Sequence, residues 1–229
     1  MRDLYHEELD SIGTTLIEMT GLVAAALNQA TDALLNADLQ LAEKVISADE
    51  KVDALQKALD ARSLDLQARQ QPVAGDLRTI ITSLRMSADI ERMGDLARHV
   101  AKVARLRYPE SAVPLELHAS ITEMGRIGVE LALKTGEIID GRDVDAARNL
   151  EEEDDAMDRL HRALFSALLA KDATYPVETA IDVTLIGRYY ERFADHAVSV
   201  AKRVVFLVTG EHADELQPDI QPVTGAEGA

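Results

Sequence analysis

The five residues Glu91-Arg92-Met93-Gly94-Asp95 return one hundred positions later as Glu191-Arg192-Phe193-Ala194-Asp195. The likeness continues to Lys102 and Lys202, and seven of the twelve residues in the two stretches are identical. The repeat predicts that the chain is a duplication. It also places two carboxylates four residues apart at matching points in each half, where a helix would hold their Cβ atoms about 5–6 Å apart on one face.

Apolar residues around this repeat recur in alternating steps of three and four, which predicts helices throughout the chain. In the first segment this stripe consists of Leu9, Ile12, Leu16, Met19, Val23, Ala26 and Ala30. The interruption at 36–38 ends the first helix, and Asp38 is the expected N-cap of a second helix that runs to about Gln70. The third helix is expected from about Pro72 to Arg107, because proline favours the first helical turn.

The second half is expected to repeat this order. Its fourth helix carries the apolar stripe from Leu117 to Ile138, and Asp143 is the expected N-cap of a fifth helix that runs to about Lys171. The sixth helix is expected to open at Pro176 and end near Gly210. The offset between the halves falls from 105 to 100, which predicts a shorter connection before the sixth helix, since insertions and deletions favour loops.

The predicted fold class is therefore all-α, with two tandem antiparallel three-helix bundles in a 3+3 repeat. The expected boundaries are 1–109 for the first bundle and 114–210 for the second. Residues 211–229 contain five acids and no Lys or Arg, which predicts a disordered acidic tail.

Composition narrows the classes of function. A formal net charge of −17 argues against a nucleic-acid surface and against binding to an anionic membrane. The absence of Cys removes disulfides, thiolate metal sites and thiol nucleophiles. No signal peptide is visible, and no apolar run approaches the roughly 20 residues that span a bilayer. We therefore expect a cytoplasmic protein that binds no nucleic acid and does not insert into a membrane.

Four pairs of carboxylates share the spacing i, i+4. They are Asp49 and Asp53, Glu91 and Asp95, Asp154 and Asp158, and Glu191 and Asp195. In each half one pair lies on the middle helix and one on the last, so antiparallel packing would bring both pairs together. Oxygen ligands alone suit hard or borderline cations such as Mg, Mn or Fe. A solvated face explains any single pair, and shared descent explains part of the recurrence, so the residues alone leave both interpretations open.

Other candidate ligands and enzyme motifs are weaker. His99 lies four residues after Asp95, but its counterpart is Ser199, which favours a surface histidine. His196 is matched by Leu96, which favours a structural role. The chain contains no Glu-x-x-His, no His-Glu-x-x-His, no phosphate-binding P-loop and no Gly-x-Ser-x-Gly. We therefore predict that the protein is not an enzyme.

Several of these elements resemble the PhoU family of phosphate-signalling accessory proteins, over about residues 1–210. The resemblance is carried by Pro72-Val73-Ala74-x-Asp76-Leu77-Arg78, by Asp89-Ile90-Glu91-Arg92-Met93-Gly94-Asp95, and by Glu191-Arg192-x-x-Asp195-His196. It implies two three-helix bundles with multinuclear metal sites on their surfaces. The implied ligands are Asp49, Asp53, Glu91 and Asp95 in the first half and Asp154, Asp158, Glu191 and Asp195 in the second, with Fe, Mn, Mg or Zn as candidate ions.

The chain also departs from the family pattern. The element that ends at Arg78 has no full counterpart after Pro176, and Gly94 is replaced by Ala194. The two predicted metal sites are therefore expected to differ in occupancy.

The same resemblance implies a function in phosphate signalling. Family members restrain the phosphate-starvation response as adaptors. They connect the ATP-binding subunit of the phosphate ABC transporter to a membrane sensor histidine kinase. A homodimer is also expected.

Two other hypotheses stay open from the residues. One is a metal-dependent hydrolase of phosphoesters or polyphosphate, in which adjacent cations would support displacement at phosphorus. The other is a helical scaffold without metal.

Overall fold

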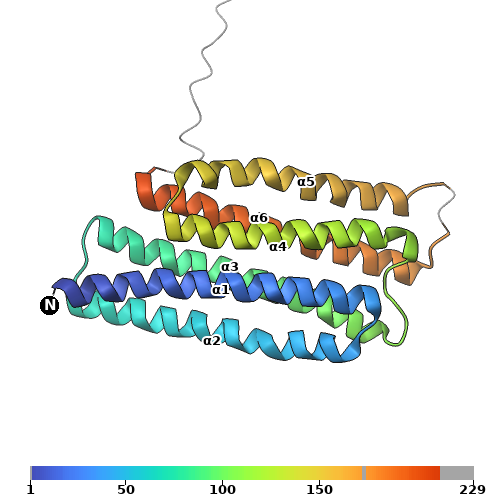
Figure 1. Cartoon of the computed structure of the whole chain (residues 1–229), viewed down its shortest axis with the longest axis horizontal. Coiled ribbons are helices and arrows are strands. Elements are labelled where there is room, and N and C mark those ends of the chain that lie inside the picture. The colour runs from blue at the N-terminus through green and yellow to red at the C-terminus, as the bar shows by residue number, and fades with distance from the viewer. Residues whose placement is uncertain (1, 172–173, 212–229) are drawn as a thin grey trace, which may run out of the picture.

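The computed structural model describes residues 2–171 and 174–211 (Figure 1). Within these residues the chain is helical and contains no strand. The helices are α1 (Arg2–Asn36), α2 (Leu39–Gln70), α3 (Gly75–Arg107), α4 (His118–Gly141), α5 (Val144–Leu168) and α6 (Val177–Thr209), with a short 3-10 helix η1 (Leu115–Leu117) before α4. The predicted 3+3 helical repeat is confirmed. Apart from Glu211, the predicted tail lies outside the described residues.

Two groups of three helices lie side by side (Figure 1). The halves meet where α1 packs on α4 and where α3 packs on α6. The middle helices of the two repeats, α2 and α5, lie on opposite outer sides of the molecule. Each of them contacts the last helix of its own half, α3 or α6. The described helices include none that is long and apolar enough to cross a membrane.

The predicted helix caps are largely correct. The Asp38 side chain accepts a hydrogen bond from the backbone N–H of Leu41, and Asp143 caps α5 in the same way. Gly210 ends α6 in the left-handed region, with φ of 83°.

Two predictions are wrong, one about the start of α3 and one about the connection before α6. α3 begins at Gly75 and not at Pro72, because the chain first turns through positive φ at Gln71 and Ala74. The expected shorter connection before α6 is also wrong. Residues 71–74 separate α2 from α3, whereas the longer segment 169–176 separates α5 from α6. The deletion falls in the helix, since α5 has 25 residues and α2 has 32.

Small residues allow the halves to pack closely along α1 and α4. A Cβ added at Gly128 of α4 would lie 2.5 Å from Cδ2 of Leu27, and one added at Gly125 would lie 2.7 Å from Oγ1 of Thr31. Both distances are shorter than van der Waals contact, so α1 can approach this closely only because α4 carries glycine there. The hydroxyl groups of Thr31 and Tyr190 form a buried hydrogen bond of 2.7 Å, which ties α1 to α6.

Polar contacts also cross between the halves. The guanidinium of Arg107 at the end of α3 donates to both carboxylate oxygens of buried Asp182 on α6. In the middle of the α3–α6 contact, Asp89 accepts from Nε of Arg203 at 2.6 Å and lies 3.2 Å from Nδ1 of His196. Burial raises the pKa of Asp89, but the hydrogen bonds to His196 and Arg203 outweigh it, so its pKa is lowered overall.

We expect Asp89→Asn to destabilise the protein at pH 7 by about 2 kcal/mol, because charge-assisted hydrogen bonds contribute about that much. An acid whose pKa is lowered in the folded state stabilises above its unfolded value of about 3.9 and loses that contribution as the pH falls through the folded value. The loss relative to wild type should therefore shrink in urea unfolding at pH 3. Asp140→Asn, at an exposed carboxylate, is the control. An equal loss at pH 3 and pH 7 would contradict this explanation.

Candidate functional site

The structure brings the eight predicted ligands together in two groups of four. The first cluster consists of Asp49 and Asp53 on α2 with Glu91 and Asp95 on α3. The second cluster consists of Asp154 and Asp158 on α5 with Glu191 and Asp195 on α6. The members of each cluster act on one another electrostatically across the two helices. The prediction that antiparallel packing juxtaposes the pairs therefore agrees with the geometry.

Arginine side chains neutralise the buried half of the first cluster. Arg98 of α3 bridges the two helices, since its Nη1 lies 3.1 Å from Oδ2 of Asp49 and its Nη2 pairs with Oδ1 of Asp95. The other oxygen of Asp95 lies 2.7 Å from Nη1 of Arg92. Only 6% of the Asp49 side chain and 12% of the Asp95 side chain is exposed. Gly94 makes room for this arrangement, because an added Cβ would lie 3.2 Å from Oδ1 of Asp49.

Two carboxyl groups of the first cluster still carry a raised pKa. Burial is the largest cause for Asp49, where the charge of Arg98 acts in the opposite direction and Asp53 adds to the increase. Burial is also the largest cause for Glu91, followed by the neighbouring charge of Asp95. The cluster therefore retains a preference for positive charge beyond what its arginines supply.

In the second cluster the negative charge of the carboxylates is offset much less by arginine side chains. Burial and then the charges of Asp195, Asp158 and Glu191 raise the pKa of Asp154 to about 7. Burial and Asp195 also raise the pKa of Glu191, although the nearby guanidinium of Arg188 acts against this. Among the described residues, the pair of Arg188 and Glu191 is the only ion pair that any member of this cluster makes. Carboxylates held together in this way favour the binding of a cation.

Two buried atoms beside the second cluster have no hydrogen-bond partner in the described structure. They are Oε2 of Glu191 and Nε2 of His161. His161 lies on α5 three residues after Asp158, and its ring packs against α6 at Gly187, where an added Cβ would lie 3.3 Å from Cδ2. Burial lowers the pKa of His161, followed by the charge of Arg188, which favours the neutral imidazole that can bind a metal. His161 was not among the predicted ligands, although its i, i+3 spacing from Asp158 was a usable signal.

The donor set of the second cluster fits a hard or borderline cation. It offers carboxylate oxygens, of which Oε2 of Glu191 is buried without a partner, and the nearby imidazole nitrogen Nε2 of His161. Within residues 2–171 and 174–211, however, no three His, Asp or Glu side chains stand in an arrangement that could hold a metal ion. A shared ion at this cluster would require its side chains to turn toward one another.

The other predicted histidines have structural surroundings. The ring of His99 packs on Tyr189 of α6 at a centroid distance of 5.3 Å, and burial followed by the charge of Lys102 lowers its pKa. His99 is therefore only partly at the surface. His196 pairs with Asp89 between the halves, as expected of a structural residue.

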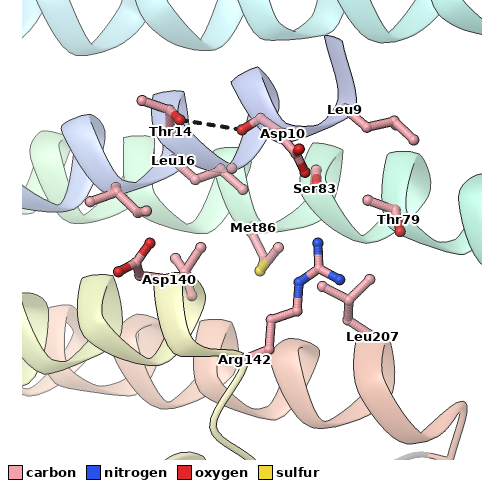
Figure 2. A pocket seen from close by; sticks show the side chains of 13 residues that line it. Leu9, Asp10, Thr14, Leu16, Thr79, Ser83, Met86, Asp140, Arg142 and Leu207 are labelled. Atoms are coloured by element: carbon pink, nitrogen blue, oxygen red, sulfur yellow. Dashed lines mark hydrogen bonds between the residues drawn. The ribbon is translucent and has the colours of Figure 1, made fainter. Parts of the chain in front are cut away.

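A separate cavity of about 240 Å³ lies where α1, α3 and α6 meet the turn between α4 and α5. Figure 2 shows the guanidinium of Arg142 pointing into it near Met86, and Asp10 of α1 and Asp140 of α4 are also among the lining residues. One arginine against two carboxylates is a poor setting for a phosphate chain. None of the lining residues belongs to either acidic cluster, so the cavity does not supply a substrate pocket for them.

Comparison with known proteins assigns this architecture to a family. The family model described as "PhoU domain" matches the chain twice, over residues 16–104 and 121–204. The chain belongs to the PhoU family. Each matched segment of this PhoU chain contains one complete acidic cluster, so the duplication of the domain is also the duplication of the candidate site.

Individual PhoU proteins resemble the chain over nearly its whole length. It is 50% identical over 92% of its length to 99% of "Phosphate-specific transport system accessory protein PhoU homolog 2" of Mycobacterium tuberculosis. It is 48% identical, over 94% of its length and 97% of the relative, to PhoU homolog 1 of Mycobacterium leprae.

Solved structures of PhoU proteins have the same fold as this chain. PhoU from Pseudomonas aeruginosa superposes with a TM-score of 0.81 at 27% identity, covering 90% of this chain and all of that one. The phosphate transport system regulatory protein PhoU from Streptococcus pneumoniae gives 0.82 at 25% identity, covering 92% and 99%.

Proposed function

We propose that this chain is a cytoplasmic negative regulator of phosphate uptake and of phosphate-starvation signalling. The observation that carries the proposal is the match, over 92–94% of the chain and with 48–50% of the aligned residues identical, to proteins named as accessory proteins of a phosphate-specific transport system. In the proposed role the chain is an adaptor between the ATP-binding subunit of the phosphate ABC transporter and a sensor histidine kinase. It performs no catalysis of its own and forms a homodimer.

The surface near the start of α6 supports a role in protein contacts. Val177, Ile181 and Leu185 are spaced four residues apart and are therefore on one face of the helix. All three are exposed large apolar side chains. An apolar row of this kind suits contact with another protein better than contact with water.

Metal binding is the second part of the proposal. The second cluster holds carboxylates that repel one another, a buried carboxylate oxygen without a partner and a neutral histidine, which together suit a cation. A bound metal would neutralise this charge and link α5 to α6. Fe, Mn, Mg and Zn are the candidate ions, and the resemblance to the PhoU family implies a site that holds more than one ion.

Co-purification tests the adaptor role. The tagged full-length chain is expected to recover the transporter's ATP-binding subunit and the sensor kinase from cells grown with ample phosphate. The same preparation, dialysed against Mn²⁺ and then against buffer, is expected to retain metal in elemental analysis. Recovery of neither partner would overturn the adaptor role, and absence of retained metal would overturn the metal-binding part.

The hydrolase alternative has less support. In the described residues, Arg98 and Arg188 beside the clusters are engaged by carboxylates, so neither is free to hold a phosphoryl group. Turnover of a phosphoester panel with Mn²⁺, lost in Asp195→Asn, would revive that function.

A further inference from the structure

We infer that the two acidic clusters are not equivalent: Arg98 acts as a built-in cation in the first, and the metal binds at the second. This inference rests on the proposed metal binding and adds which site is used and which residue decides it. It follows from a single difference between the repeats. The residue one hundred positions after Arg98 is Val198, whose short apolar side chain cannot reach a carboxylate.

In the first cluster Arg98 already occupies the place of a cation. Its two terminal nitrogens bind Asp49 on α2 and Asp95 on α3, which are the two buried members of the cluster. A guanidinium that bridges two carboxylates offsets part of their negative charge and fixes their geometry at the same time. A metal ion could take both carboxylates only by expelling this side chain, 70% of which is buried, since 30% is exposed.

In the second cluster, as far as the structure describes it, no arginine bridges the carboxylates of the two helices. Val198 on α6 is buried. Asp195, the counterpart of Asp95, is exposed, and among the described residues neither it nor Asp154 makes an ion pair. The one arginine that approaches, Arg188, pairs with Oε1 of Glu191 and leaves Oε2 buried without a partner. An ion that binds these carboxylates therefore has no bridging arginine to displace.

A purely structural role for Arg98 makes a different prediction. If Arg98 only stabilised α2 against α3, its loss would change the melting temperature but not the number of metal ions bound. If Arg98 stands in for a cation, its loss should create a new metal site at the first cluster, and an arginine at position 198 should block metal binding at the second. The duplicated chain therefore allows the residues at positions 98 and 198 to be exchanged as a test.

The first comparison uses matched double variants that leave Arg98 in place. Mn²⁺ binding to the full-length, chelator-treated protein is measured by isothermal titration calorimetry. Asp158→Asn/Glu191→Gln, in the second cluster, is expected to weaken Mn²⁺ binding at least tenfold. Asp53→Asn/Glu91→Gln, at the equivalent positions of the first cluster, is expected to change it less than twofold. Equal losses in both double variants would overturn the inference.

The second comparison exchanges the deciding residue. Arg98→Val is expected to bind additional Mn²⁺ that is lost again when Asp53→Asn/Glu91→Gln is added, and circular dichroism checks that it folds. Val198→Arg, which does not touch the first cluster, is expected to weaken wild-type Mn²⁺ binding at least tenfold, so the test does not depend on Arg98→Val folding. Unchanged binding in Val198→Arg would overturn the inference. No Mn²⁺ binding by wild type would instead overturn the proposed metal binding itself.

Discussion

Asp154→Asn is expected to make the chelator-treated protein more stable than wild type at pH 8. The pKa of Asp154 is raised to about 7, first by burial and then by Asp195, Asp158 and Glu191. The folded state therefore binds this proton more tightly than the unfolded state does, and wild-type stability should fall as the pH rises from about 4 to about 7. The full shift corresponds to about 4 kcal/mol, but Asp154 is only half-buried and solvent screens it, so we expect a gain of about 1–2 kcal/mol.

A saturating metal should reverse this order. An ion that binds the folded state at one hundred times its Kd stabilises it by about 2.7 kcal/mol, and a variant that lacks a ligand loses most of that. The free energies of unfolding of wild type and Asp154→Asn are measured in urea at pH 5 and pH 8, each with chelator and with Mn²⁺, which compares the two proteins under four conditions. Asp155→Asn, at the exposed neighbouring carboxylate, should stay within about 0.5 kcal/mol of wild type. If Asp154→Asn were less stable than wild type at pH 8 in chelator, repulsion between the carboxylates of the second cluster would not be the dominant effect.

Phe193→Ala is expected to cost about 3–5 kcal/mol of unfolding free energy, the usual range for a fully buried aromatic ring. Phe193 is 0% exposed. Its ring lies against α4 at Gly128, where an added Cβ would be 3.6 Å from Cδ1. Helix backbone on that side cannot collapse into the space left by the ring. For a protein of this size the melting temperature should fall by about 10 °C.

Phe193→Ala should also affect the candidate metal site. Phe193 lies between Glu191 and Asp195 on α6, so a loosened helix should also weaken Mn²⁺ binding. Leu185→Ala on the same helix, at a side chain that is 42% exposed, is the control and should change stability by less than about 0.5 kcal/mol. A thermal melt is the measurement. A fall of only one or two degrees for Phe193→Ala would mean that α6 does not pack as described.

Local signals in the sequence were sufficient to predict the helices. Periodic apolar residues and the caps Asp38 and Asp143 act over one or two turns, and the structure confirms them. The start of α3 was missed because Pro72 is permitted in a first helical turn, while Ala74 in fact takes a positive φ that its residue type does not announce. The i, i+4 spacing correctly placed the carboxylates on facing helices, since that geometry needs only a helix and an antiparallel neighbour.

Contacts between helices far apart in the sequence could not be predicted in the same way. Arg98 was visible as a neighbour of Asp95, but its bridge to Asp49 depends on which rotamer the α2–α3 packing allows. Arg107 and Asp182 are 75 positions apart, and no pattern in either helix links them. His161 does not recur in the repeat that predicted the other ligands, because its equivalent in the first half is Gln56, which is not a typical metal ligand.

A phosphate-responsive reporter tests the central claim most directly. A strain that lacks this gene is complemented with the wild-type chain, and expression of a phosphate-starvation promoter is measured under ample phosphate. The proposed function predicts high expression in the deletion strain and repression to the parental level on complementation. Low expression in the deletion strain, or high expression that the wild-type chain does not reduce, would contradict a negative regulator of phosphate signalling.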